Sequence, residues 1–263
     1  MKIKNRKIHV VGINSFEFEE LSSSVKSLLR KIENIAIPQS YFDQVNVWFN
    51  KSENCKKKLF SSGSNNDLIE WLENNKSDLV LISRGDPLWF GIGRVLLNHF
   101  PKDELLFYPS LTCVQLAFSR LKKPWQGVKC ISIHGREIDE LIKAMKSRTH
   151  NLAIIPDHKK NNLELIRRNL LELQLDNFYE IWICEELGFK GEKFTALKTN
   201  EELPKDISEL YIIILTKKEV FDYKDNYPLF GINDSLFKTF DDRPNLLTKK
   251  EIRIQILADL ELP

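Results

Sequence analysis

The sequence predicts an α/β fold with mostly parallel strands. Short runs rich in β-branched residues alternate along the chain with longer amphipathic stretches, which is the pattern of strand–helix units. The runs at 79–82 and 211–215 are apolar without alternation, as expected of strands covered on both faces. With 263 residues, the chain is long enough to bury a large core without disulfide or metal support.

Seven runs read as strands because they are short, β-branched and bounded by polar or turn-forming residues. They span residues 8–12, 78–83, 105–108, 129–134, 151–155, 179–184 and 210–216. Between them, six stretches place apolar residues at the three- and four-residue spacing of a helix. These stretches cover residues 17–31, 67–75, 92–99, 113–121, 137–146 and 163–173. The polar, basic segment 51–58 is expected to be a solvated loop.

Charge and hydropathy exclude several classes of protein. The 39 Lys and Arg residues against 37 Asp and Glu give a net charge of +2, which offers no electrostatic basis for bulk nucleic-acid binding. No apolar run approaches the roughly 18 residues of a membrane span, and the basic start of the chain does not lead into a signal-peptide core. We therefore expect a cytoplasmic protein without a nucleic-acid or membrane partner.

The cysteines do not form a metal site. Cys55, Cys113, Cys130 and Cys184 are widely spaced, without a CxxC pair or an adjacent His cluster. We interpret them as small, mostly buried apolar residues in a reducing compartment, and no metal ligand is predicted.

Three glycines follow the strand at 78–83. The chain has ten glycines in all, yet Gly85, Gly91 and Gly93 fall within nine residues. Glycine at the end of a strand allows close approach of a ligand or a positive φ angle, and ligands of α/β sheets gather at the carboxyl ends of strands. The alternative is a tight strand-to-helix turn without a ligand. The segment matches neither the GxGxxG dinucleotide pattern nor the GxxxxGK[ST] phosphate loop, which disfavours phosphate binding.

Five segments in order resemble the tetrapyrrole methylase family, and in particular its branch that methylates C5 of precorrin-6Y. They are SRGDPLWFGIG (83–93), VQLAFSRL (114–121), PWQ (124–126), IHGR (133–136) and CEELGF (184–189). The resemblance covers about residues 7–217. It implies two α/β domains with a cleft between them, at 1–109 and 110–222, followed by a tail at 223–263. It also implies methyl transfer from S-adenosylmethionine (SAM) to a late precorrin of cobalamin biosynthesis, by a homodimer.

Two loops depart from the pattern of this family. The first loop, usually Gly-x-Gly-Pro-Gly, reads GINS here (12–15), and the family's Pro-Gly before the second site loop is Pro109–Ser110. Asn14 stands in the first of these loops, and asparagine adopts left-handed dihedral angles more readily than most residues, so we expect the turn to be kept.

The resemblance assigns SAM binding largely to main-chain groups. The matching positions are Gly85, Asp86, Pro87, Trp89, Gly91, Thr112, Cys113 and Leu187. For Asp86 the alternative is a carboxylate that caps the turn before the following helix. For Trp89 and the adjacent Phe90 the alternative is ordinary core packing.

Two residues of the IHGR segment are candidates for the acceptor side. The precorrin is a polycarboxylate, and arginine binds carboxylates in bidentate fashion, so we expect Arg136 to bind an acidic side chain of the substrate. We expect His134 to act on a proton as the methylated ring rearranges, the alternative being a structural strand-end histidine. Arg84 and Arg94 are further candidates, for which a solvated position is expected.

The tail resembles the opening of the second module of the fused, bifunctional enzyme, which methylates C15 and decarboxylates a side chain. The matching segments are PLFGIND (228–234) and LLTKKEIR (246–253). The glycine-rich SAM loop of that module is missing, so we expect this chain to lack the second activity. The simpler interpretation, compatible with the first, is a helix at 249–260.

Two other functions remain open at this stage. One is a SAM methyltransferase of the same fold that acts on RNA or protein. The other is a non-catalytic, SAM-binding scaffold subunit. The near-neutral charge argues against RNA, and the IHGR and PWQ segments favour the precorrin branch.

Overall fold

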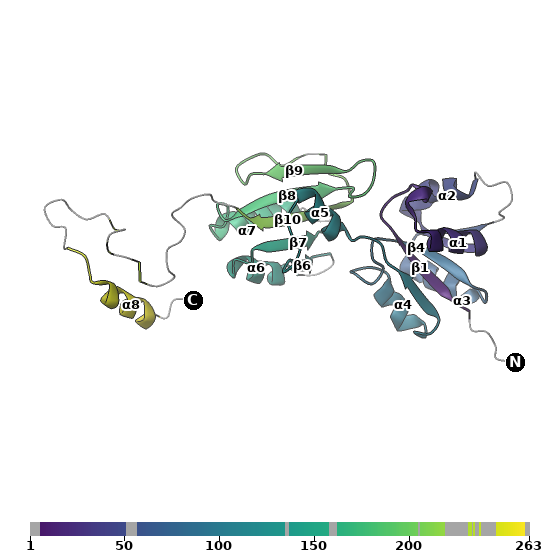
Figure 1. Cartoon of the computed structure of the whole chain (residues 1–263), viewed down its shortest axis with the longest axis horizontal. Coiled ribbons are helices and arrows are strands. Elements are labelled where there is room, and N and C mark those ends of the chain that lie inside the picture. Colours follow the sequence, from purple (N-terminus) through teal and green to yellow (C-terminus); the bar gives the residue numbers. More distant parts are fainter. Residues whose placement is uncertain are drawn as a thin grey trace. The chain divides into compact units, whose positions relative to one another are not determined.

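The chain divides into two compact units, Met1–Lys218 and Glu219–Pro263, which are described separately (Figure 1). The computed structural model describes residues 6–50, 57–134, 137–157, 162–204, 206–218, 231–232, 234, 237 and 246–260. None of the helices in these ranges is long and apolar enough to cross a membrane.

The first sheet is fully parallel, as the sequence predicts. Its strand order is β3-β2-β4-β1-β5, and in Figure 1 its strands are coloured from purple (β1) to teal (β5). The strands are β1 (Ile8–Ile13), β2 (Asn34–Pro38), β3 (Lys58–Ser62), β4 (Leu79–Arg84) and β5 (Leu105–Tyr108). Val10 lies opposite both Leu81 of β4 and Phe107 of β5 in register. Parallel pairing places the carboxyl ends of β1, β4 and β5 together at one edge of the sheet.

Helices cover both faces of the first sheet, and this explains the continuous apolar runs of β1 and β4. One face packs against α1 (Ser23–Lys31) and α2 (Phe42–Asn50), and the other against α3 (Asn65–Asn74) and α4 (Gly93–His99). Serine caps begin α1 and α3, since the hydroxyls of Ser22 and Ser64 accept hydrogen bonds from backbone N–H groups three residues later.

The second sheet is mixed, which corrects the expectation of mostly parallel pairing for this half of the chain. Its order is β6-β7-β10-β8-β9, and only the β6–β7 pair is parallel. The strands are β6 (Lys129–Ser132), β7 (Asn151–Ile155), β8 (Tyr179–Glu185), β9 (Lys193–Leu197) and β10 (Tyr211–Lys217). β10 lies between β7 and β8 and runs antiparallel to both. Its apolar run is buried, with Ile213, Ile214 and Leu215 fully covered.

Helices also cover both faces of the second sheet. α5 (Cys113–Leu121) packs on the face that contains Ala153, Cys184 and Ile212. α6 (Asp139–Lys146) and α7 (Asn162–Glu172) pack on the opposite face.

Four elements were not predicted, namely β2, α2, β3 and β9. β2 and β3 are only five residues long, and β3 starts at Lys58, inside the segment expected to be a loop. The rest of that segment, 51–56, lies outside the described residues. The helix expected at 17–31 is shorter, because a 3₁₀ turn (Phe18–Glu20) comes first and the Ser22 cap sets the start of α1.

In the second unit, the expected terminal helix is confirmed as α8 (Lys250–Asp259). Arg253 of α8 forms an ion pair of 2.7 Å with Asp234 and donates a hydrogen bond to the carbonyl of Ile232. The likeness of this tail to a second methyltransferase module stays a prediction.

Candidate functional site

Three loops meet at the carboxyl edge of the first sheet, and the backbone of Gly85 joins them. Its N–H donates to the carbonyl of Ile13 (2.8 Å), and its carbonyl accepts from the N–H of Ser110 (3.2 Å). Gly12 lies so close that a Cβ atom there would be 1.8 Å from the Gly85 oxygen. Glycine is therefore required at position 12 by close contact, whereas Gly85 adopts a left-handed φ of +59°.

The two residues that depart from the family's loop pattern bind each other. The Ser110 hydroxyl donates a hydrogen bond of 2.9 Å to the Asn14 side-chain oxygen. Asn14 is not among the residues with positive φ, so this loop does not use a left-handed asparagine. The interaction between side chains, rather than backbone permissiveness, links the two loops here.

The segment from Asp86 to Gly93 forms a tightly packed turn. The Asp86 carboxylate accepts a hydrogen bond from the N–H of Leu88 (2.9 Å), and the carbonyl of Pro87 accepts from Gly93 N–H (2.8 Å). A Cβ atom at Gly91 or Gly93 would lie 2.7 Å from that carbonyl oxygen. One oxygen of the Asp86 carboxylate thus caps the turn that follows it, as the alternative interpretation of Asp86 expects. The helix after this turn, α4, begins without a side-chain cap.

Phe90 is strained within this turn. Its φ is +48°, a region that a bulky side chain rarely adopts, and its side chain is 48% exposed. Its ring packs edge-on against Trp89, with centroids 4.9 Å apart. Strained, exposed residues of this kind concentrate at binding sites.

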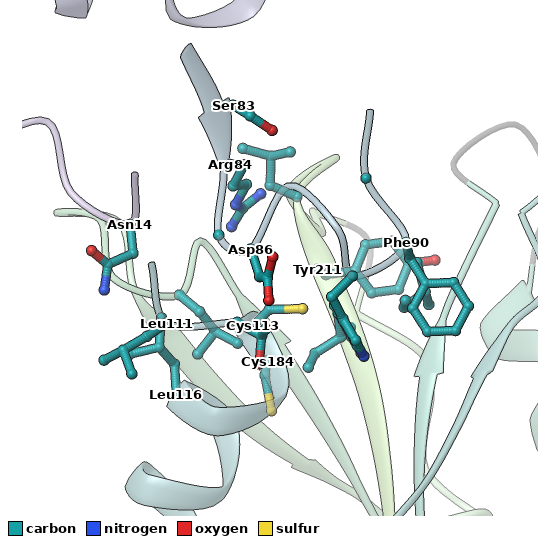
Figure 2. Close-up of a pocket in the computed structure, with 18 residues that line it drawn as sticks. Asn14, Ser83, Arg84, Asp86, Phe90, Leu111, Cys113, Leu116, Cys184 and Tyr211 are labelled. Carbon is teal, nitrogen blue, oxygen red and sulfur yellow. The ribbon is translucent and has the colours of Figure 1, made fainter. Parts of the chain in front are cut away.

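A cavity of about 260 Å³ lies between the two sheets, beside this turn. Figure 2 shows its labelled lining, with Asn14 at one end and Phe90 at the other. Most of the lining is apolar, and among the described lining residues Arg84 and Asp86 carry the charges. Such a combination of apolar walls and few polar groups is typical of small-molecule sites. The lining residues are Asn14, Ser83, Arg84, Gly85, Asp86, Trp89, Phe90, Gly91, Leu111, Thr112, Cys113, Leu116, Ile155, Cys184, Leu187, Leu210, Tyr211 and Ile212.

The start of α5 forms part of the wall. Thr112 is its N-cap in a capping box with Gln115, in which the Thr112 hydroxyl accepts from Gln115 N–H (3.2 Å) and Thr112 N–H donates to the Gln115 side chain (2.8 Å). These bonds occupy the side chain and the N–H of Thr112, so its polar groups mainly fix the helix.

The thiols of Cys113 and Cys184 line the cavity as neutral groups. Burial raises the pKa of Cys113 to about 11 and that of Cys184 to about 12. Only a thiolate attacks or ligates metal. At neutral pH these cysteines therefore contribute apolar surface, as the sequence suggests, rather than a nucleophile.

A second cavity, of about 460 Å³, adjoins the first and contains His134. It shares Phe90, Gly91 and Ile155 with the first cavity. His134 Nδ1 lies 3.7 Å from Oδ1 of Asp157, a buried carboxylate. Arg94 also lines this cavity and is exposed, as expected.

The structure brings together most of the residues predicted to bind SAM. Gly85, Asp86, Trp89, Gly91, Thr112, Cys113 and Leu187 all line the 260 Å³ cavity. Pro87 is buried behind the turn and is not part of the described lining. His134 lies in the neighbouring cavity, and Arg136 lies outside the described residues.

Sequence reasoning missed the wall contributed by the second sheet. Tyr211 and Ile212 lie at the beginning of β10, where the register places them opposite Glu185 and Cys184 at the end of β8. The rule that ligands meet carboxyl ends of strands could not find them, because β10 runs antiparallel. The only available signal was the strand assignment of 210–216 itself.

Comparison with known proteins places these features in a family. Residues 7–203 match the family described as Tetrapyrrole (Corrin/Porphyrin) Methylases. A probable cobalt-precorrin-7 C(5)-methyltransferase from Methanocaldococcus jannaschii is 23% identical over 213 residues, which cover 79% of this chain and 96% of the relative.

Two solved structures share the fold. The precorrin-6Y methylase of cobalamin biosynthesis from Archaeoglobus fulgidus is 21% identical, with a TM-score of 0.57 over 81% of this chain and 98% of that one. The uroporphyrin-III C-methyltransferase from Thermus thermophilus, in complex with S-adenosylhomocysteine, is 16% identical, with a TM-score of 0.56 over 80% and 97%. Since the family match spans both sheets except β10, this chain belongs to the tetrapyrrole (corrin/porphyrin) methylase family.

Proposed function

We propose that this protein is a SAM-dependent C-methyltransferase that methylates C5 of a late precorrin in cobalamin biosynthesis. The observation that supports this most directly is the mostly apolar cavity at the turn of residues 85–91. The match to a relative named as a probable cobalt-precorrin-7 C(5)-methyltransferase, 96% of which is covered, supports it further. The five sequence segments typical of the precorrin branch support the same assignment.

The residues of the 260 Å³ cavity suit SAM. The cavity is mostly apolar, as the adenine and thioether portions require, and one oxygen of Asp86, Oδ2, has no partner among the described residues. Asp86, Trp89, Gly91, Cys113 and Leu187 are the side chains and backbone groups that would hold it. Gly85 acts mainly as the junction of the loops, because its N–H and carbonyl already bond to other loops.

When bound, SAM supplies a methyl group activated by its sulfonium sulfur, so the protein needs no nucleophile of its own. The apolar walls exclude water from the reacting groups, and the rigid turn at 86–93 orients the two ligands. Phe90 lies at the boundary of both cavities, where its exposed ring can stack against the acceptor macrocycle.

His134 is the group that would accept a proton in the acceptor cavity. Asp157 faces its Nδ1 and orients the imidazole toward the acceptor cavity. Asp157 acts here as a positioning residue, through its effect on the imidazole. Arg136 is proposed to bind an acidic side chain of the acceptor.

A direct assay tests the function. The purified protein is incubated with SAM and a cobalt-precorrin prepared up to the C5-methylation step, and mass spectrometry measures the tetrapyrrole. Gain of one methyl group, with an equal amount of S-adenosylhomocysteine, is the expected result. A His134→Ala variant should bind S-adenosylhomocysteine normally but methylate slowly, and Arg168→Gln, a surface change, should behave as wild type.

Three results would overturn the proposal. They are methylation of RNA or protein in place of the tetrapyrrole, binding of S-adenosylhomocysteine without any transfer, and no binding at all. The second result would identify a scaffold subunit.

We also propose the remaining organisation. The domains are 1–109 and 110–222, the tail 223–263 corresponds to the start of a second methyltransferase module, and the protein is a cytoplasmic homodimer. Light scattering should give twice the 30.8 kDa of one chain.

A further inference from the structure

Arg84, at the end of β4, has no acidic partner in the part of the chain that the structure describes. Contrary to the expected solvated position, it is half-buried, and its guanidinium carbon lies 5.0 Å from the centre of the Phe189 ring. The Tyr41 hydroxyl is a further neighbour of Arg84. A cation held in place and partly removed from water, without a carboxylate, is costly unless a ligand supplies the negative charge.

A crevice of about 250 Å³ begins at Arg84. It follows the carboxyl ends of β2, β3 and β4 to the first turn of α3, and it shares only Ser83 and Arg84 with the described lining of the 260 Å³ cavity. Hydroxyl groups are frequent along it, and no carboxylate is among its described lining residues. The polar members of the lining are Ser40, Tyr41, Ser62, Ser64, Asn65, Ser83 and Arg84.

Ser83 offers the crevice a second hydrogen-bond donor beside Arg84. It is 8% exposed, and its hydroxyl has no hydrogen-bond partner among the described residues. Figure 2 shows it beside Arg84 at the end of β4. The Ser83 oxygen is not among the fully buried atoms that lack a partner, so it stays accessible from the crevice, where it can donate to an acceptor oxygen.

The remaining groups of the crevice agree with an anion. The crevice reaches Ser64 and Asn65, the N-cap and the first residue of α3, and the dipole of the helix favours negative charge there. Asp67, in the first turn of α3, is the nearest acidic residue on that helix. Its side chain is exposed outside the described lining, and its N–H is bound by the Ser64 hydroxyl.

We propose that Arg84 and Ser83 form a subsite for one carboxylate side chain of the acceptor tetrapyrrole. This inference rests on the proposed function, since a late precorrin carries acetate and propionate side chains. Arg84 donates paired hydrogen bonds to the carboxylate, and Ser83 donates one more. Because the crevice leaves the 260 Å³ cavity at these two residues, a side chain bound in it anchors the macrocycle beside the methyl donor.

The carboxylate of the methyl donor is the other possible source of the same chemistry, and the experiment separates the two. Arg84→Gln, Ser83→Ala and the control Arg168→Gln, which removes an exposed helix-surface arginine, are compared with wild type. Calorimetry measures S-adenosylhomocysteine affinity, steady-state kinetics measure KM for the cobalt-precorrin, and fluorescence measures binding of uroporphyrin, a polycarboxylate macrocycle.

We expect Arg84→Gln to raise KM and the uroporphyrin Kd at least tenfold, Ser83→Ala to raise both about threefold to tenfold, and both to keep S-adenosylhomocysteine affinity within twofold. These factors follow from the loss of a hydrogen bond to a charged group or to a neutral hydroxyl. The octamethyl ester of uroporphyrin should bind all variants equally, since it lacks the anions.

Other outcomes of these measurements would contradict either the carboxylate subsite or the proposed function. If the variants lose S-adenosylhomocysteine affinity and tetrapyrrole affinity equally, Arg84 and Ser83 bind the carboxylate of the methyl donor, and the proposed subsite is wrong. Unchanged tetrapyrrole binding in Arg84→Gln would also overturn the subsite. If the wild type fails to methylate the precorrin while uroporphyrin binding still depends on Arg84, the proposed function fails and the subsite stands.

Discussion

Replacement of Gly12 by alanine should disrupt the junction of the three loops. The new Cβ atom would lie 1.8 Å from the Gly85 oxygen and 3.0 Å from the Ser110 nitrogen, both of which are backbone atoms that cannot rotate away. To reach an ordinary contact of 3.4 Å, the Gly85 carbonyl must retreat by about 1.6 Å. That movement breaks the hydrogen bonds from Ser110 N–H to Gly85 and from Gly85 N–H to Ile13.

The size of the effect follows from these losses. Two backbone hydrogen bonds contribute about 2 kcal/mol together, and the displaced turn adds strain, so we expect the free energy of unfolding to fall by about 2–4 kcal/mol. The displaced turn also forms the wall of the 260 Å³ cavity, so S-adenosylhomocysteine affinity should fall at least tenfold. Thermal denaturation and calorimetry measure the two effects.

Gly127→Ala is the matched control. Gly127 has a φ of +73° but no atom within 4 Å of the position of a Cβ, so alanine there costs about 1 kcal/mol of stability through backbone strain alone. It should leave S-adenosylhomocysteine affinity unchanged. If Gly12→Ala binds S-adenosylhomocysteine as wild type does, the loop junction does not shape the cavity and the reasoning is refuted.

Three further predictions concern the same region. Phe90→Gly should stabilise the fold by about 1 kcal/mol in thermal denaturation, because it relieves the left-handed strain, yet raise KM for the precorrin; loss of stability, or an unchanged KM, would contradict the role given to this ring. The alkylation rate of Cys113, followed by peptide mass spectrometry, should rise about tenfold per pH unit from pH 7 toward its pKa of about 11, since the thiolate fraction grows below the pKa, and a plateau near pH 9 would show an ordinary thiol. Asn14→Ala and Ser110→Ala should each destabilise the protein in urea denaturation, and their double-mutant cycle should give a coupling of about 1 kcal/mol, whereas additive effects would mean that the hydrogen bond contributes nothing.

The first sheet could be predicted in part because its central strands follow simple rules. β1 and β4 are buried on both faces, and their apolar runs mark them clearly in the sequence. β2 and β3 could not be found, because such five-residue strands have little apolar periodicity. β2 takes its structure from pairing with β4, and β3 from pairing with β2. The antiparallel course of β10 is a tertiary property that local patterns do not encode.

The candidate site likewise contains residues that local sequence patterns predict and contacts that depend on the tertiary structure. Residues of the turn from Gly85 to Gly91 could be predicted from glycine spacing and from resemblance to the family. The hydrogen bond between Asn14 and Ser110 could not, since the two positions are 96 residues apart and each departs from the family pattern separately. The contact of Arg84 with the Phe189 ring could not be predicted either, because Phe189 follows β8, far from Arg84 in the sequence.

The position of β10 determines when the protein can first bind a ligand during synthesis. Until Tyr211–Lys217 has left the ribosome, β7 and β8 lack the strand that separates them, and one wall of the 260 Å³ cavity does not exist. The first sheet, by contrast, is complete once Tyr108 has emerged. A nascent chain halted between these points would contain the glycine turn in a folded half but would lack a wall of the cavity, so ligand capture reports that the last strand has been inserted.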